Sequence, residues 1–83
     1  METIIVEICI ASTGMVADFM LPAHVQVSKL IGELARLIEQ HFQETSFAKE
    51  APMLCDMATR QFLPENQTLA QAGIRDGHRL MIV

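Results

Sequence analysis

The architecture of the chain is clearest in one stretch near its carboxyl-terminal end, Thr68-Leu69-Ala70-Gln71-Ala72-Gly73-Ile74-Arg75-Asp76-Gly77-His78-Arg79-Leu80-Met81-Ile82-Val83. Residues 68–72 predict a short helical turn. Gly73 suits the left-handed backbone position that follows such a turn, and Asp76-Gly77 is typical of a tight turn. The stretch therefore predicts a compact connection that leads directly into a strand.

The residues after this turn predict a final strand. Side chains alternate, with Leu80 and Ile82 facing the core and Met81 and Val83 facing outward. The sequence stops at Val83, so we expect no flexible tail beyond the strand. Any function is then expected on the folded surface.

The first strand is predicted over residues 4–10, which are rich in β-branched side chains. Glu7 marks the solvent-facing side, and period-two alternation places Ile5 and Cys9 on that side with it. The inward residues are Ile4, Val6, Ile8 and Ile10.

A turn at Ser12-Thr13-Gly14 and a returning strand at residues 15–21 complete a hairpin. Asp18 sets the phase of this second strand, with Val16 and Met20 outward beside it. The residues expected to face the core are Met15, Ala17, Phe19 and Leu21.

The next segment predicts a helix. Pro22-Ala23-His24 breaks the strand, and from about Val27 the apolar period changes to that of a helix. Gly32 in its interior is expected to reflect close packing or simple tolerance, since glycine costs about 1 kcal/mol there relative to alanine. The apolar stripe consists of Val27, Leu30, Ile31, Leu34, Ile38 and Phe42.

Residues 43–51 are polar, lack a clear period and predict a surface loop. Residues 52–57 alternate and predict a third strand. Taking Asp56 as a solvent-facing residue puts Leu54 outward with it and places Met53, Cys55 and Met57 inward. Residues 61–63 predict a brief fourth strand.

These elements make an α+β fold of order ββαββ, short helical turn, β, in which one helix packs on one face of a mixed sheet. A length of 83 residues allows one domain, expected to span residues 1–83. Because 51% of the residues are hydrophobic, we expect some apolar surface to remain exposed.

Composition argues against several function classes. The net charge is −4 and the few basic residues are scattered, which is unfavourable for nucleic acid binding. The apolar runs are far shorter than the roughly 20 residues that span a bilayer, and no signal peptide opens the chain. We therefore expect a cytoplasmic protein without membrane insertion, in which Cys9 and Cys55 are free thiols.

Nothing in the sequence predicts a catalytic, metal or cofactor site. His24, His41 and His78 lie in different elements without metal-ligand spacing. Cys9 shares its face with Glu7, and no neighbouring cation favours a reactive thiolate. We therefore expect a protein that is not an enzyme.

Three stretches carry a resemblance to a known family: Leu21-Pro22-Ala23 leading into Val27-Ser28-Lys29-Leu30-Ile31, then residues 61–69, then residues 73–80. With the order of elements, they resemble the ubiquitin-like β-grasp fold and, within it, the YukD/EsaB proteins of Gram-positive type VII secretion systems. The resemblance implies a non-catalytic accessory or regulatory component. It also implies two partners, a membrane-bound pseudokinase-like protein and a secretion ATPase, and a peripheral position at a membrane complex.

A ubiquitin-like modifier or sulfur carrier is the alternative. Such proteins need a slim, flexible tail ending in Gly-Gly that can be threaded into an active site. Here the last residues are Ile82-Val83, within a predicted strand, which disfavours the alternative.

The expected binding site is the sheet face opposite the helix. Its outward apolar residues are Ile5, Cys9, Val16, Met20, Leu54, Met81 and Val83. We interpret them as a protein-binding or self-association patch, with rim packing as the alternative. Strand addition at the edge formed by residues 15–21 is a second route, and the sequence leaves open whether the occupant is another protein or a second copy.

Overall fold

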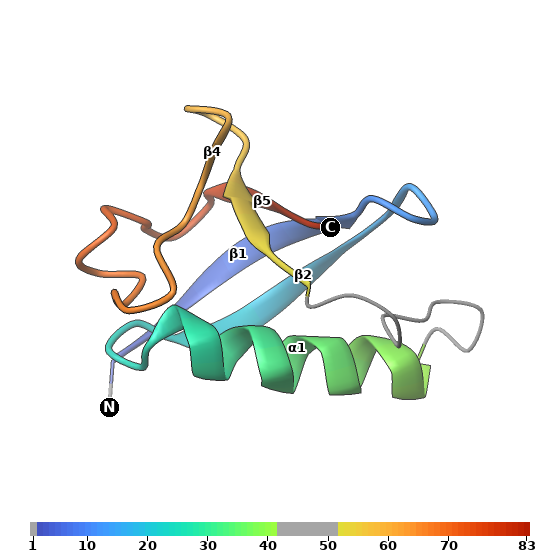
Figure 1. Cartoon of the computed structure of the whole chain (residues 1–83), viewed down its shortest axis with the longest axis horizontal. Helices are drawn as coiled ribbons and strands as arrows, with labels where there is room; N and C mark the ends of the chain where they lie inside the picture. Colours follow the sequence, from blue (N-terminus) through green and yellow to red (C-terminus); the bar gives the residue numbers. More distant parts are fainter. Residues whose placement is uncertain (1, 42–51) are drawn as a thin grey trace.

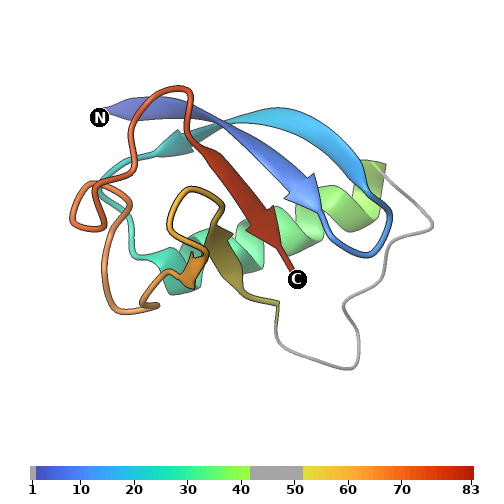
Figure 2. The ribbon, with the colours of Figure 1, turned by 90° about the horizontal axis from the view of Figure 1, so that it is seen from above.

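The computed structural model describes residues 2–41 and 52–83. Five strands form one mixed sheet in the order β2-β1-β5-β3-β4, in which β1 pairs with β5 in parallel and the other pairs are antiparallel. The elements are β1 (Thr3–Ile10), β2 (Met15–Pro22), α1 (Val27–His41), β3 (Leu54–Asp56), β4 (Gln61–Phe62) and β5 (Arg79–Ile82). Helix α1 covers one face of the sheet (Figure 1), and Figure 2 views the sheet with the helix behind it. The predicted fold class is confirmed.

The core lies between this helix and the sheet. In β1 the alternation is as predicted, because Ile4, Val6, Ile8 and Ile10 are buried. In β5, Leu80 and Ile82 are fully buried beside them. Each such side chain contributes about 1.5–3 kcal/mol by leaving water, so the two central strands supply much of the stabilisation.

The helix presents its apolar stripe to this core. The predicted stripe is confirmed for Val27, Leu30, Ile31, Leu34 and Ile38, all buried, while Phe42 and the loop predicted at 43–51 lie outside the described residues. The first helical N–H groups lack partners within a helix. Here the Val27 N–H donates to the Gln67 carbonyl at 2.7 Å and the Ser28 N–H to the Glu65 carbonyl at 3.1 Å. The loop after β4 therefore fixes where the helix begins.

The segment before β5, residues 68–78, is stabilised by side-chain hydrogen bonds that the sequence pattern did not predict and by a glycine turn that it did. Thr68 and Gln71 form a reciprocal pair, in which the Gln71 N–H donates to Thr68 Oγ1 at 3.1 Å and the Thr68 N–H donates to Gln71 Oε1 at 3.0 Å. Gly73 has φ of 78°, as its predicted left-handed position requires.

The tight turn at Asp76-Gly77 joins this segment to β1. The Ile5 N–H donates to Asp76 Oδ1 at 2.7 Å, and the Gly77 N–H donates to the Ile5 carbonyl at 2.8 Å. These two bonds extend the parallel pairing of β1 and β5 beyond the strand itself.

The predicted phase of the third strand was wrong. Leu54 is only 1% exposed and belongs to the core, whereas Met53 and Met57 are 42% and 41% exposed. Asp56 is buried although it is charged, because its Oδ1 accepts the Ala58 N–H at 3.0 Å. An aspartate that caps a turn in this way does not mark the solvent-facing side.

The inward face of β2 was predicted only in part. Leu21 is buried and Phe19 packs against the core, but Met15 is 44% exposed. In the described part of the chain, strand β2 has a neighbouring strand on one side only, and Met15 is its first residue. An apolar residue at that corner of the sheet is not enclosed.

The Gly32→Ala variant should be more stable by about 0.5–1 kcal/mol, because glycine in a helix interior loses more backbone entropy on folding. Apart from the adjoining residues and the backbone of its own helix, a methyl group at this position meets no described atom within 4 Å. Urea denaturation of the two proteins measures the difference. A less stable variant would show that position 32 does not lie in an open helical turn.

Candidate interaction surface

The outer face, meaning the sheet face opposite α1, carries a row of apolar side chains that crosses every strand. Cys9 pairs with Val16 of β2 on one side and with Met81 of β5 on the other. Met81 pairs in turn with Cys55, and Cys55 with Phe62 of β4. Residues paired in this way project from the same face of a sheet, about 5 Å apart. We call Val16, Cys9, Met81, Cys55 and Phe62 the apolar row.

The ends of the apolar row are its most exposed parts. Val16 is 54% exposed and Phe62 56% exposed, while the three residues between them are half-buried. Met53 and Val83 extend the row on one side, because their backbones exchange hydrogen bonds of 2.9 and 3.0 Å and both side chains are about two-fifths exposed. Together these side chains form a contiguous, partly exposed apolar patch, a feature that can mark an interaction site.

A charged row runs parallel to the apolar row on its other side. Glu7 lies between Asp18 of β2 and Arg79 of β5. Arg79 Nε is 3.5 Å from Glu7 Oε1, and among the described residues Asp18 has no ion pair. Beyond the charged row, Met20 and Ile5 form a second apolar pair and are 66% and 48% exposed.

The sequence prediction placed most of this surface correctly. The outer face carries Ile5, Cys9, Val16, Met20, Met81 and Val83 as expected, and Leu54 is the exception because it lies in the core. The inverted phase of β3 also hid three exposed or half-buried residues on the outward side of that segment, Met53, Cys55 and Met57. Phe62 of β4 was missed for another reason, since it joins the outer face only by pairing with Cys55. The turn formed by Asp56 and Ala58 is the local signal that identifies the correct phase.

The two cysteines of the outer face are free thiols, as predicted. Strand β5 separates them, which puts their Cα atoms about 10 Å apart. A disulfide needs Cα atoms closer than about 7 Å, so the two cannot form one within a single chain without backbone movement. In the described part of the chain, no three His, Cys, Asp or Glu side chains gather in a group that could hold a metal ion.

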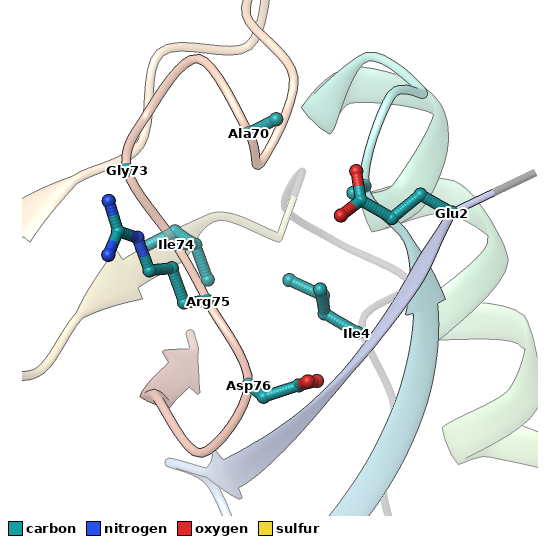
Figure 3. A pocket seen from close by; sticks show the side chains of 8 residues that line it. Glu2, Ile4, Ala70, Gly73, Ile74, Arg75 and Asp76 are labelled. Atoms are coloured by element: carbon teal, nitrogen blue, oxygen red, sulfur yellow. The ribbon is translucent and has the colours of Figure 1, made fainter.

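A groove of about 420 Å³ opens between the start of β1 and the 70–76 segment (Figure 3). Glu2 and Arg75 lie on opposite walls of this groove in Figure 3. The Glu2 carboxylate is 2.7 Å from His24 Nε2, and the Asp76 carboxylate accepts the Ile5 N–H. Both carboxylates are therefore engaged with other groups of the chain, Glu2 in an exposed pair and Asp76 in the turn before β5.

Within residues 2–41 and 52–83, no helix is both long and apolar enough to cross a membrane.

Five strands in this order with one covering helix define a ubiquitin-like β-grasp protein. The family model of the WXG100 protein secretion system (Wss) protein YukD matches residues 3–82, so the chain belongs to the YukD family. No curated protein matches the chain.

Solved structures of secretion proteins share the fold. The EccD5 ubiquitin-like domain from Mycobacterium xenopi is 21% identical with a TM-score of 0.85, and the alignment covers 100% of this chain and 94% of that one. The ubiquitin-like domain of the Mycobacterium tuberculosis type VII secretion protein EccD1 is 23% identical with a TM-score of 0.81, covering 100% and 99%. A chain of the MycP5-free ESX-5 inner membrane complex is 21% identical with a TM-score of 0.83, covering 100% of this chain and 21% of that one.

The Leu54→Ala variant should lose about 2–5 kcal/mol of unfolding free energy, because it leaves a cavity in the core. The matched Phe62→Ala variant should lose less than about 1 kcal/mol, since Phe62 is largely in solvent. Urea denaturation of both proteins tests the assignment of faces. Equal losses would contradict it.

Proposed function

We propose that this protein is a non-catalytic interaction component of a WXG100 secretion system and binds a protein partner through the outer face. The observation that carries the proposal is the apolar row, which runs unbroken from β2 to β4. A sheet face that stays exposed to water normally carries more polar side chains than this one does. Methionines 53, 57 and 81 add flexible side chains that adapt to a partner's surface.

Membership of the YukD family and the arrangement of the exposed residues support this role together. The family resemblance implies two partner proteins, a membrane-bound pseudokinase-like component and a secretion ATPase. The similarity to a chain of the ESX-5 inner membrane complex supports a partner at a membrane complex. In this proposal the protein acts in the cytoplasm and associates peripherally with that complex, with an accessory or regulatory role.

The secretion role is tested by deleting the gene in its own organism and measuring export of the small helical WXG100 substrates. The deletion strain should retain the substrates in the cells while synthesising them normally. Immunoblots of culture medium and cell lysate measure both quantities. Unchanged export in the deletion strain would contradict the role.

The outer face is tested by complementing the same strain with variants. The Phe62→Arg and Met81→Arg double variant places two charges in the apolar row. It should restore export at least tenfold less well than the wild type, since a side chain that the partner buries contributes about 1–3 kcal/mol to binding. Leu37→Arg is the matched control, because Leu37 is an apolar residue of α1 that is 36% exposed. Full complementation by the double variant, at equal protein abundance, would contradict binding through this face.

A further inference from the structure

Strand β2 is the longer free edge of the sheet. Among residues 2–41 and 52–83 it pairs only with β1, and its register with β1 is continuous from Thr3 and Pro22 to Ile10 and Met15, without a bulge. The opposite edge strand, β4, has two residues. Edge strands of soluble proteins are usually shortened, bulged or carry lysines that discourage pairing with another chain. Strand β2 has eight residues and only one charge, Asp18.

The parallel pairing of β1 with β5 shows which groups of β2 face the open edge. The N–H groups of Glu7 and Ala11 donate to β5 and its preceding residue, and the Ile5 carbonyl accepts from Gly77. Odd residues of β1 therefore bond toward β5, and even residues bond toward β2, since backbone groups alternate along a strand. The bond from the Ala23 N–H to the Glu2 carbonyl, at 3.0 Å, follows the same pattern.

The even-numbered residues of β1 lie opposite odd-numbered residues of β2, and these pairs exchange the hydrogen bonds between the two strands. The even-numbered residues of β2, Val16, Asp18 and Met20, therefore direct their N–H and C=O groups away from β1. No other hydrogen bond within the described part of the chain uses these backbone groups. An incoming strand can pair with all three. The side chains of the same three residues lie on the outer face, where the strand's own side chains would meet them.

Asp18 determines the chemistry of that incoming strand. It lies directly opposite Glu7 in a pair whose residues do not exchange hydrogen bonds, the arrangement that brings side chains closest, and like charges so placed destabilise a sheet. Glu7 has Arg79 on its other side, whereas Asp18 has no cation among the described residues. A basic residue opposite Asp18 would supply the missing charge, with apolar residues two positions before and after it opposite Val16 and Met20.

We propose that the edge of β2 binds an extended segment of a partner protein that has a lysine or arginine with an apolar residue two positions away on each side. The pattern is the same in both chain directions. The β2 strand of a second copy does not fit, because it contains no basic residue to place opposite Asp18. This inference rests on the proposed interaction role and specifies the segment that the partner supplies.

Titration with capped peptides tests the pattern. The probe has the core Val-Thr-Arg-Thr-Val, and the control peptide replaces its arginine with glutamate. The arginine peptide should bind roughly tenfold more tightly, because a cross-strand attraction replaces a repulsion. The Asp18→Lys variant should reverse the preference. Equal binding of the two peptides, or no binding of either, would overturn the proposal.

Two variants at one position separate strand addition from side-chain docking. Met20→Pro removes the edge N–H while leaving the bonds to β1 in place, and edge strands tolerate proline in this orientation. It should abolish peptide binding, whereas Met20→Thr keeps the N–H and should weaken binding only severalfold. Val16→Pro repeats the test should Met20→Pro fail to fold by circular dichroism. A folded proline variant that binds as tightly as its wild type would overturn the proposal.

The same variants separate this proposal from the secretion role. Restored export by a folded Met20→Pro protein would overturn strand addition as the means of partner binding and leave the role intact. Unchanged export after gene deletion would overturn the role, while peptide binding in solution would still be measurable.

Discussion

The parallel pairing of β1 with β5 is the interaction on which the rest of the structure depends. It joins residues that are more than 70 positions apart, and the Asp76 carboxylate extends it to Ile5. The pairing decides which residues of β1 direct their backbone groups toward β5. Because backbone direction and side-chain direction alternate together along a strand, the same residues place their side chains on the outer face and the residues between them face the core. The buried faces of β1 and β5, the pairing of Cys9 with Met81 in the apolar row and the orientation of the open edge of β2 follow from this register.

Local periodicity was sufficient to predict the elements whose environment is uniform along their length. The isoleucines of β1 and the stripe of α1 face a continuous core, so alternation and helical spacing identified the buried residues correctly. The final strand was predicted for the same reason. Turn chemistry at Gly73 and Asp76-Gly77 was equally local, and the structure confirms it.

The prediction failed where a side chain's position depends on a neighbour that is distant in sequence or on a specific hydrogen bond. Asp56 is buried because it caps a turn, and reading it as a solvent-facing residue inverted β3 and placed Leu54 on the wrong side. The place of Phe62 in the apolar row depends on strand order, which alternation within one strand does not contain. The exposure of Met15 depends on β2 being an edge.

The outer face and the edge of β2 form one continuous surface, because Val16 and Met20 contribute side chains to the first and backbone groups to the second. The central claim is that a partner covers this surface. A photo-crosslinking amino acid placed at position 62 in the living organism tests it most directly, with position 37 on α1 as the reference. The account predicts that position 62 crosslinks to a component of the secretion complex and position 37 does not; crosslinking to that component from position 37 alone would contradict it.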